Sequence, residues 1–87
     1  MPNVDLLARE SSVQTRAQLS EFISALRDDL HASPDSWENP MLDRYLEAMA
    51  GWVHDMPGYF KNQGIEEPAQ PSWALLATIL HAAKIYE

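Results

Sequence analysis

Three histidines are the side chains of this chain best suited to holding a metal ion. His31, His54 and His81 fall near the expected ends of three successive helices. In an up-down-up bundle the C-terminal ends of the first and third helices meet, so His31 and His81 could be neighbours beside Asp28. His54 would lie a helix length away, which argues against a three-histidine zinc site. A partial positive charge suits a helix C-terminus, so the simpler role is structural, and we expect no metal and no cofactor.

Two carboxylates and a histidine share one face of the second expected helix. Asp43 and Glu47 are four residues apart, and His54 follows on the same side. Paired carboxylates act as acid and base when one of them is desolvated. This face lies opposite the apolar stripe, so both groups should be solvated. The chain also lacks a glycine-rich phosphate loop and a nucleophile–base pair, and we therefore expect no enzymatic activity.

Asp28 and Asp29 are acidic residues at a position where negative charge is unfavourable. They fall in the last turn of the first expected helix, where each negative charge costs about 0.3–1 kcal/mol. Such a violation can mark a functional residue. Alternatively, Arg27, His31 or a residue from across the bundle offsets the cost. Both interpretations remain open on the sequence alone.

Negative charge is concentrated in the middle of the chain. The formal net charge is −7, and all but one of these net charges fall between Asp28 and Asp55. A one-sided negative field repels nucleic acid and anionic membranes and attracts basic proteins. We therefore expect no nucleic-acid and no membrane partner. The acidic residues of this stretch are Asp28, Asp29, Asp35, Glu38, Asp43, Glu47 and Asp55, against a single Arg44.

The length of 87 residues predicts one small domain. A chain of this size buries only about 60% of its unfolded surface, so it must use nearly every large side chain. It has no cysteine, which excludes disulfides and thiolate metal sites. It also lacks a basic start followed by an apolar run, and it has no apolar run of about 20 residues. We therefore expect a cytoplasmic protein.

Helical spacing of apolar residues predicts an all-α fold, an antiparallel three-helix bundle. We expect helices over about 16–32, 40–55 and 73–86, with a short helical turn near 34–38. Residues 56–72, rich in proline and glycine, should form a long packed loop. The third helix is apolar over more than half its girth and should be central. Residues 12–87 form the single domain, and 1–11 are an N-terminal segment that is either flexible or docked through Leu6 and Leu7.

Local signals set the expected helix ends. Thr15 and Gln18 have the spacing of a capping box, and Ser72 should cap the last helix. Asn39 followed by Pro40 predicts the start of the middle helix, and Pro57 its end. Gly51 inside the middle helix costs roughly 1 kcal/mol relative to alanine. It therefore indicates a close approach by a loop, a second subunit or a partner, with internal packing favoured.

Aromatic residues beside the acidic stretch have two possible roles. Tyr59 and Phe60 follow Asp55, and Trp37 precedes the middle helix. Rigid aromatics are enriched in protein interfaces, so these three could anchor a partner. Alternatively they plug the ends of the bundle, as a small core requires. The candidate partner-binding residues are Asp28, Asp29, Trp37, Asp43, Glu47, Asp55, Tyr59 and Phe60.

Several short motifs, taken together, resemble a known protein family. They are Trp37-Glu38-Asn39-Pro40, the segment from Leu46 to Trp52, residues 55–62, Pro71-Ser72-Trp73 and residues 82–87. The chain is similar over about residues 12–87 to a family of short acidic bacterial proteins known only as a domain of unknown function. The resemblance implies a small free-standing protein and no established activity or cofactor.

These observations favour a protein that binds another protein. The leading hypothesis is an interaction module, of inhibitor or immunity type, that recognises a basic protein surface through the acidic stretch. The alternative is a homodimeric structural or regulatory protein that buries excess apolar surface of the third helix or of the Gly51 and Trp52 face. A small-ligand domain is disfavoured, because a three-helix bundle of this size has little room for a pocket of ~300 Å³.

Overall fold

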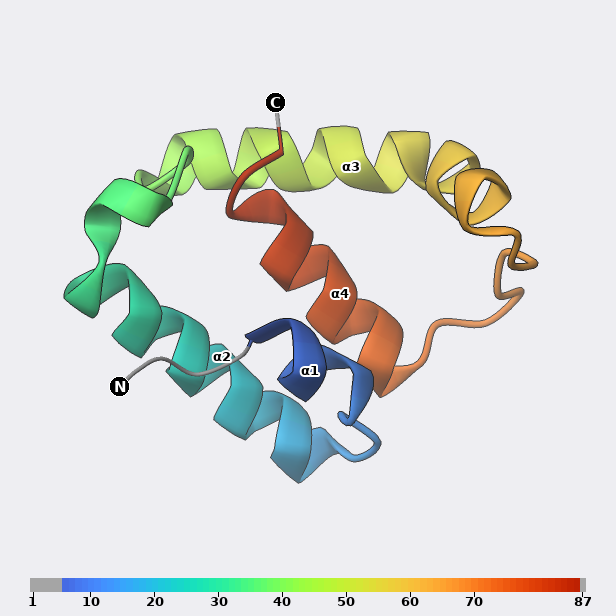
Figure 1. The fold of residues 1–87 in the computed structure, drawn as a ribbon, viewed down its shortest axis with the longest axis horizontal. Helices are drawn as coiled ribbons and strands as arrows, with labels where there is room; N and C mark the ends of the chain where they lie inside the picture. The colour runs from blue at the N-terminus through green and yellow to red at the C-terminus, as the bar shows by residue number, and fades with distance from the viewer. Residues whose placement is uncertain (1–5, 87) are drawn as a thin grey trace.

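Four α-helices and one short 3-10 turn make up the part of the chain that the computed structural model describes, residues 6–86 without the side chains of Leu7 and Ala8. The helices are α1 (Leu6–Ser11), α2 (Arg16–Ala32), α3 (Leu42–Gln63) and α4 (Trp73–Ala83), and the 3-10 turn η1 (Pro34–Ser36) joins α2 to α3. The all-helical fold is as expected. Helix α4 contacts α1, α2 and α3, and so it is central (Figure 1).

The arrangement is more open than a regular three-helix bundle. Among the described residues, α3 packs on α4 and makes no comparable contact with α2. Figure 1 shows α3 crossing above the other helices, with α4 running obliquely from the lower right up to its middle. The chain thus has one central helix with three neighbours instead of three mutually packed rods.

Helix α1 was not among the predicted elements. Residues 6–11, which the sequence analysis left as flexible or docked, form a helix that contacts both α2 and α4. Leu6 is buried in the same core cluster as Phe22, Leu26 and Ala77. Ala25 of α2 is also buried, since α1 gives α2 a second neighbour. The remainder of the predicted N-terminal segment, residues 1–5, lies outside the described residues.

Helix α2 has the predicted boundaries, and its N-terminal cap is confirmed. The Thr15 hydroxyl accepts a hydrogen bond from the Gln18 amide at 3.1 Å. The Gln18 side chain reaches back one residue further than a standard capping box, to the Gln14 amide at 2.7 Å. Ser72 caps α4 in the same way, since its hydroxyl accepts from the Leu75 amide at 3.0 Å.

The predicted end of the middle helix is wrong. Helix α3 passes through Pro57 and Gly58 and ends at Gln63, so only residues 64–72 form the loop expected over 56–72. An internal proline costs ~3 kcal/mol, and packing offsets this cost. The Tyr59 ring lies 5.2 Å from the Trp52 ring and 5.1 Å from the Phe60 ring, centroid to centroid.

Gly64 ends α3 instead of Pro57. Its φ of 70° is left-handed, a conformation that glycine adopts without strain. The Gly64 amide donates to the Lys61 carbonyl and the Ile65 amide donates to the Phe60 carbonyl, which is the Schellman pattern. A glycine after a helical stretch is a sequence signal for a helix end, and the prediction based on Pro57 did not use it.

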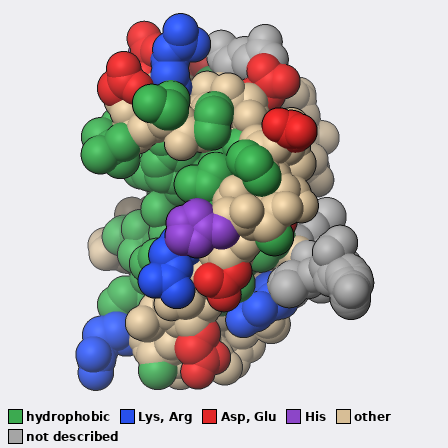
Figure 2. All heavy atoms as spheres, turned by 90° about the vertical axis from the view of Figure 1, so that its left-hand side faces the viewer, with side chains coloured by type: hydrophobic (Ala, Val, Ile, Leu, Met, Phe, Trp, Pro, Cys, Tyr) green, Lys and Arg blue, Asp and Glu red, His purple; other side chains and the backbone are tan. Residues whose placement is uncertain are grey.

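One side of the molecule carries exposed hydrophobic side chains from three helices. In Figure 2 they gather along the left-hand part of the view, the side turned away from the reader in Figure 1, and the outline is indented there. The large hydrophobic residues exposed on α2, α3 and α4 are Ile23, Leu42, Leu46, Val53, Tyr59, Trp73 and Leu76.

Candidate functional site

Three of the eight candidate partner-binding residues are internal. Trp37 and Phe60 are buried, and Asp29 is partly buried beside Trp37 and the end of α4. Trp37 lies 5.8 Å from the Tyr45 ring and belongs to the core cluster. Neither Trp37 nor Phe60 can anchor a partner without leaving the core. Both therefore have the plugging role that the sequence analysis kept as the alternative.

Asp29 of α2 forms hydrogen bonds with the residues that directly follow η1 and α4. Its Oδ2 accepts from Trp37 Nε1 at 2.8 Å and from Lys84 Nζ at 2.9 Å. Burial acts to raise the pKa of Asp29, but the hydrogen bonds from Lys84 and Trp37 and the charge of Lys84 outweigh it and lower the pKa. Lys84 also lies 5.6 Å from the Trp37 ring centroid, within cation–π range. A residue from across the fold thus offsets the unfavourable position of Asp29.

The other acidic candidates are exposed. Asp28 makes an exposed ion pair with Arg27 at 3.4 Å, a contact of small energetic value. Asp43 accepts from the Arg44 amide at 2.8 Å, and Glu47 is exposed one turn later. Since these carboxylates are solvated, as expected, they can contribute charge to a surface.

Asp55 has partners of its own. It accepts a hydrogen bond from the Tyr86 hydroxyl, and its Oδ1 lies 3.0 Å from His54 Nδ1. The Tyr86 hydrogen bond, followed by that of His54, lowers the pKa of Asp55. The same bond with Asp55 raises the pKa of Tyr86. The pair ties the end of the chain to the middle of α3.

Asn39 has a role that the sequence analysis missed. It does not cap α3, which begins at Leu42 after an N-cap, Met41, that makes no side-chain capping bond. Its side-chain Nδ2 donates to the carbonyls of Ala83 at 3.1 Å and Tyr86 at 2.9 Å. Its backbone amide donates to the Lys84 carbonyl. Asn39 therefore satisfies carbonyls at the end of α4, which stops at Ala83 instead of continuing to residue 86.

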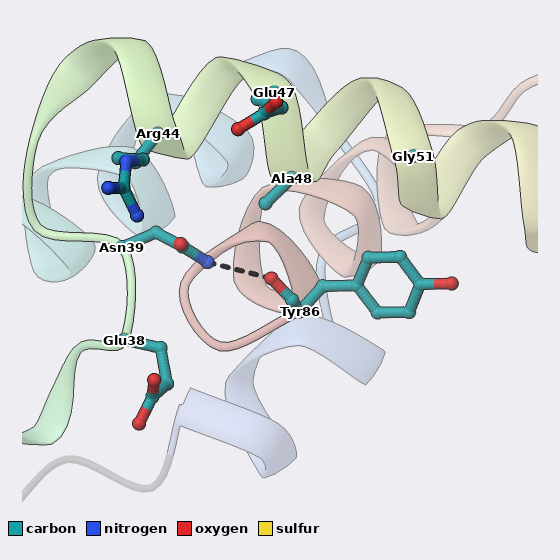
Figure 3. A pocket seen from close by; sticks show the side chains of 7 residues that line it. All are labelled: Glu38, Asn39, Arg44, Glu47, Ala48, Gly51 and Tyr86. Atoms are coloured by element: carbon teal, nitrogen blue, oxygen red, sulfur yellow. Dashed lines mark hydrogen bonds between the residues drawn. The ribbon is translucent and has the colours of Figure 1, made fainter.

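An open pocket lies where these elements meet (Figure 3). It measures about 560 Å³, larger than the sequence analysis allowed for, and it is not enclosed. In Figure 3, Arg44 and Glu47 project from α3, Glu38 comes from the segment before it, and the Tyr86 ring lies along α3 below Gly51. A Cβ added at Gly51 would meet Tyr86 Cε2 at 3.4 Å. The close approach predicted from Gly51 is thus internal, made by the C-terminal segment.

The histidines are distributed differently from the prediction. His81 pairs with Glu10 of α1 at 2.5 Å and contacts the Phe22 ring edge-on. The second Glu10 oxygen accepts from the Thr78 hydroxyl at 2.8 Å. His54 lies in mid-helix, because α3 continues to Gln63. Within residues 6–86 no group of three or more His, Cys, Asp or Glu side chains has an arrangement that could hold a metal ion.

The arrangement is suited to protein contact. The exposed carboxylates of Glu38, which precedes α3, and of Glu47 on α3 border an open pocket that has an aromatic ring on one wall. Among the described residues, none of the helices has the length and apolar character needed to cross a bilayer. We call the exposed carboxylates of Asp35, Glu38, Asp43 and Glu47, together with this pocket, the acidic surface.

Comparison with known proteins gives one match. Residues 15–87 match the model of DUF7660, described as a family of unknown function. The match confirms that the chain resembles a family of unknown function. Searches of curated proteins and of solved structures found nothing similar.

Proposed function

Given that this chain belongs to DUF7660, a family of unknown function, we propose that it is a non-enzymatic interaction module that binds a basic protein through the acidic surface. The observation that carries the proposal is the exposure of Glu38 and Glu47 beside the open pocket. In its sharpest form the module is a bacterial, cytoplasmic inhibitor or immunity-type protein that neutralises a cationic toxin or nuclease.

Charge and shape have separate roles in this proposal. Exposed carboxylates accelerate encounter with a basic protein and make the association sensitive to salt. Affinity then requires a desolvated contact. The Tyr86 ring, which lines the pocket with Glu47, replaces Trp37 and Phe60 as the candidate aromatic anchor. An arginine or lysine side chain of the partner would fit between a carboxylate and that ring.

Capture from extracts of the native host, followed by binding measurements, tests the proposal. The bait is the full chain, and the variant carries Asp43→Lys and Glu47→Lys. The matched control carries Glu66→Lys and Glu67→Lys, which make the same charge change on the exposed loop after α3. We expect a basic protein to be captured at low salt and released at high salt. Its Kd should rise at least about tenfold in the α3 variant, with a much smaller effect in the control.

Two results would contradict the proposal. One is the absence of any basic protein among the captured proteins. The other is a partner whose Kd responds equally to both pairs of substitutions, because the effect would then reflect net charge alone. Cell fractionation of the host tests the proposed cytoplasmic location.

A further inference from the structure

Helix α4 is apolar around most of its circumference but is covered on only part of it. Thr78 and His81 contact Glu10 of α1. At about 100° per residue, the side of α4 opposite these two carries Trp73, Leu76 and Leu80. Trp73 is 40% exposed, although it opens the most apolar helix of the chain. Leu80 is partly buried against the core cluster, whereas Trp73 and Leu76 are exposed, since α2 and α3 flank α4 without a comparable contact between them among the described residues.

The flanking helices add apolar walls to this exposed floor. On α3, Leu42, Leu46 and Val53 fall within about 40° of one another, roughly a third of a turn from the side that faces α4. Leu42 is 70% exposed and Leu46 52% exposed. On α2, Ile23 is 47% exposed beside the buried Phe22. We call these walls and the α4 floor the apolar groove.

The two rims of the apolar groove carry opposite charges. Viewed down the axis of α3, Asp43 and Glu47 are rotated by roughly 60–100° from Leu46. Viewed down the axis of α2, Arg16 and Arg27 are rotated by about 20–40° from Ile23 in the same sense. All four charged side chains are exposed, and the Arg27 ion pair with Asp28 is too weak to hold Arg27 away from another carboxylate.

We propose that the apolar groove is covered by the apolar groove of a second copy of this chain, in a twofold-symmetric dimer. A twofold axis that runs along α4 in the plane of the groove places α3 of each copy over α2 of the other. The acidic rim of one copy then meets the basic rim of its partner twice, as an isologous interface requires. A uniformly basic or uniformly acidic partner would be repelled by one of the two rims.

The internal core gives independent support for self-association. Phe22 is the largest side chain that is almost completely buried, at 1% exposure. Many of the other large apolar side chains of α2, α3 and α4 keep a third or more of their surface exposed. Monomeric proteins seldom expose contiguous apolar patches above a few hundred Å². Small domains without disulfides or metals often gain stability by oligomerising.

This inference goes beyond the proposed function and does not depend on it. The apolar groove lies on the side of α4 away from α1, whereas the pocket of the acidic surface lies beside Tyr86. A dimer formed through the groove therefore leaves Glu38 and Tyr86 of both pockets free, whereas Asp43 and Glu47 of the acidic surface lie at the rims of the interface.

Sedimentation equilibrium on the full chain, from low to high micromolar concentration, tests the dimer. Ile23→Ser and Leu46→Ser each replace an exposed groove residue. Ile85→Ser is the matched control, since Ile85 is 56% exposed but follows the end of α4 and is not part of the groove. We expect a dimer for the wild type and the control, and a dissociation constant at least about tenfold higher for each groove variant. A strictly monomeric wild type, or a dimer unaffected by both groove substitutions, would overturn the inference.

A charge swap tests the pairing of the rims without removing apolar area. Arg27→Glu and Glu47→Arg should each weaken the dimer, and the double variant should recover most of the lost affinity. Additive losses in the double variant would overturn the proposed orientation of the two copies. Circular dichroism confirms that each variant is folded. A monomer that still captures a basic protein would remove this inference and leave the proposed function standing.

Discussion

The two sides of α4 differ in how far the rest of the chain covers them. On one side, α1 covers the helix, and Glu10 pairs with both Thr78 and His81. On the other, Trp73 and Leu76 are left exposed in the floor of the apolar groove. The covered side makes specific polar contacts with α1, whereas the uncovered side has apolar surface between charged rims. The fold therefore stabilises α4 internally on one side, and the dimer that we propose would cover the other.

The largest difference in unfolding free energy between a core position and a groove position should appear at two adjacent residues of α2. Phe22→Ala removes a fully buried ring and should cost about 3–5 kcal/mol of unfolding free energy. Ile23→Ala removes a side chain from the groove wall and should cost less than about 1 kcal/mol at low micromolar concentration, where a dimer dissociates. Urea denaturation of both variants measures the contrast. Equal costs would mean that the groove side of α2 is as well packed as the core side.

Contacts between α1 and α4 should contribute the next largest effect. Glu10→Ala leaves the Thr78 hydroxyl and the His81 ring without their partly buried partner and should cost about 1–3 kcal/mol. Glu21→Ala is the control, because Glu21 is exposed on α2, and it should change stability by less than about 0.5 kcal/mol. Thermal and urea unfolding give both values. A neutral Glu10 variant would show that α1 does not stabilise the covered side.

Asp29 provides a pH-dependent test of the contacts at the end of α4. Because its folded-state pKa lies below the ordinary value of 3.8, its contribution is present above that value and is lost as the pH falls through the lowered pKa. Asp29→Asn should therefore cost about 1–2 kcal/mol near pH 7, and the difference from wild type should shrink below about pH 4. Asp28→Asn is the exposed neighbour for comparison. A pH-independent cost would show that Asp29 does not act through its charge.

Gly51→Ala should have the smallest effect and the opposite sign. Alanine is favoured over glycine in a helix by up to about 1 kcal/mol, and its Cβ would make an ordinary contact with the Tyr86 ring at 3.4 Å. We expect a small increase in melting temperature. A loss of stability would mean that the C-terminal segment packs more tightly on α3 than the structure shows.

Elements governed by neighbouring residues were the easiest to predict. The start of α2 at Thr15 and of α4 at Ser72 was correct, because each cap is made within three residues. The acids at Asp43 and Glu47 were correctly placed on the solvent side, because helical spacing alone assigns their face.

Predictions that depended on distant partners failed. Asn39 was read as a cap for the helix that follows it, but its partners lie 44 and 47 residues away. Trp37 and Asp29 were grouped with a partner surface, yet they bond to each other inside the fold. Helix α1 was missed because six residues carry too little periodicity, and its burial depends on α4.

The sequence by itself determined that the chain is helical, where α2 and α4 start, and that the middle of the chain is acidic. Hydrogen bonds between near neighbours and the spacing of apolar residues are sufficient for those properties. Only the tertiary structure decided that α3 continues through Pro57, that Asn39 holds the end of α4, and that α2 and α3 stay apart. Each of these outcomes depends on free energy gained between residues far apart in the chain, which local preferences do not contain.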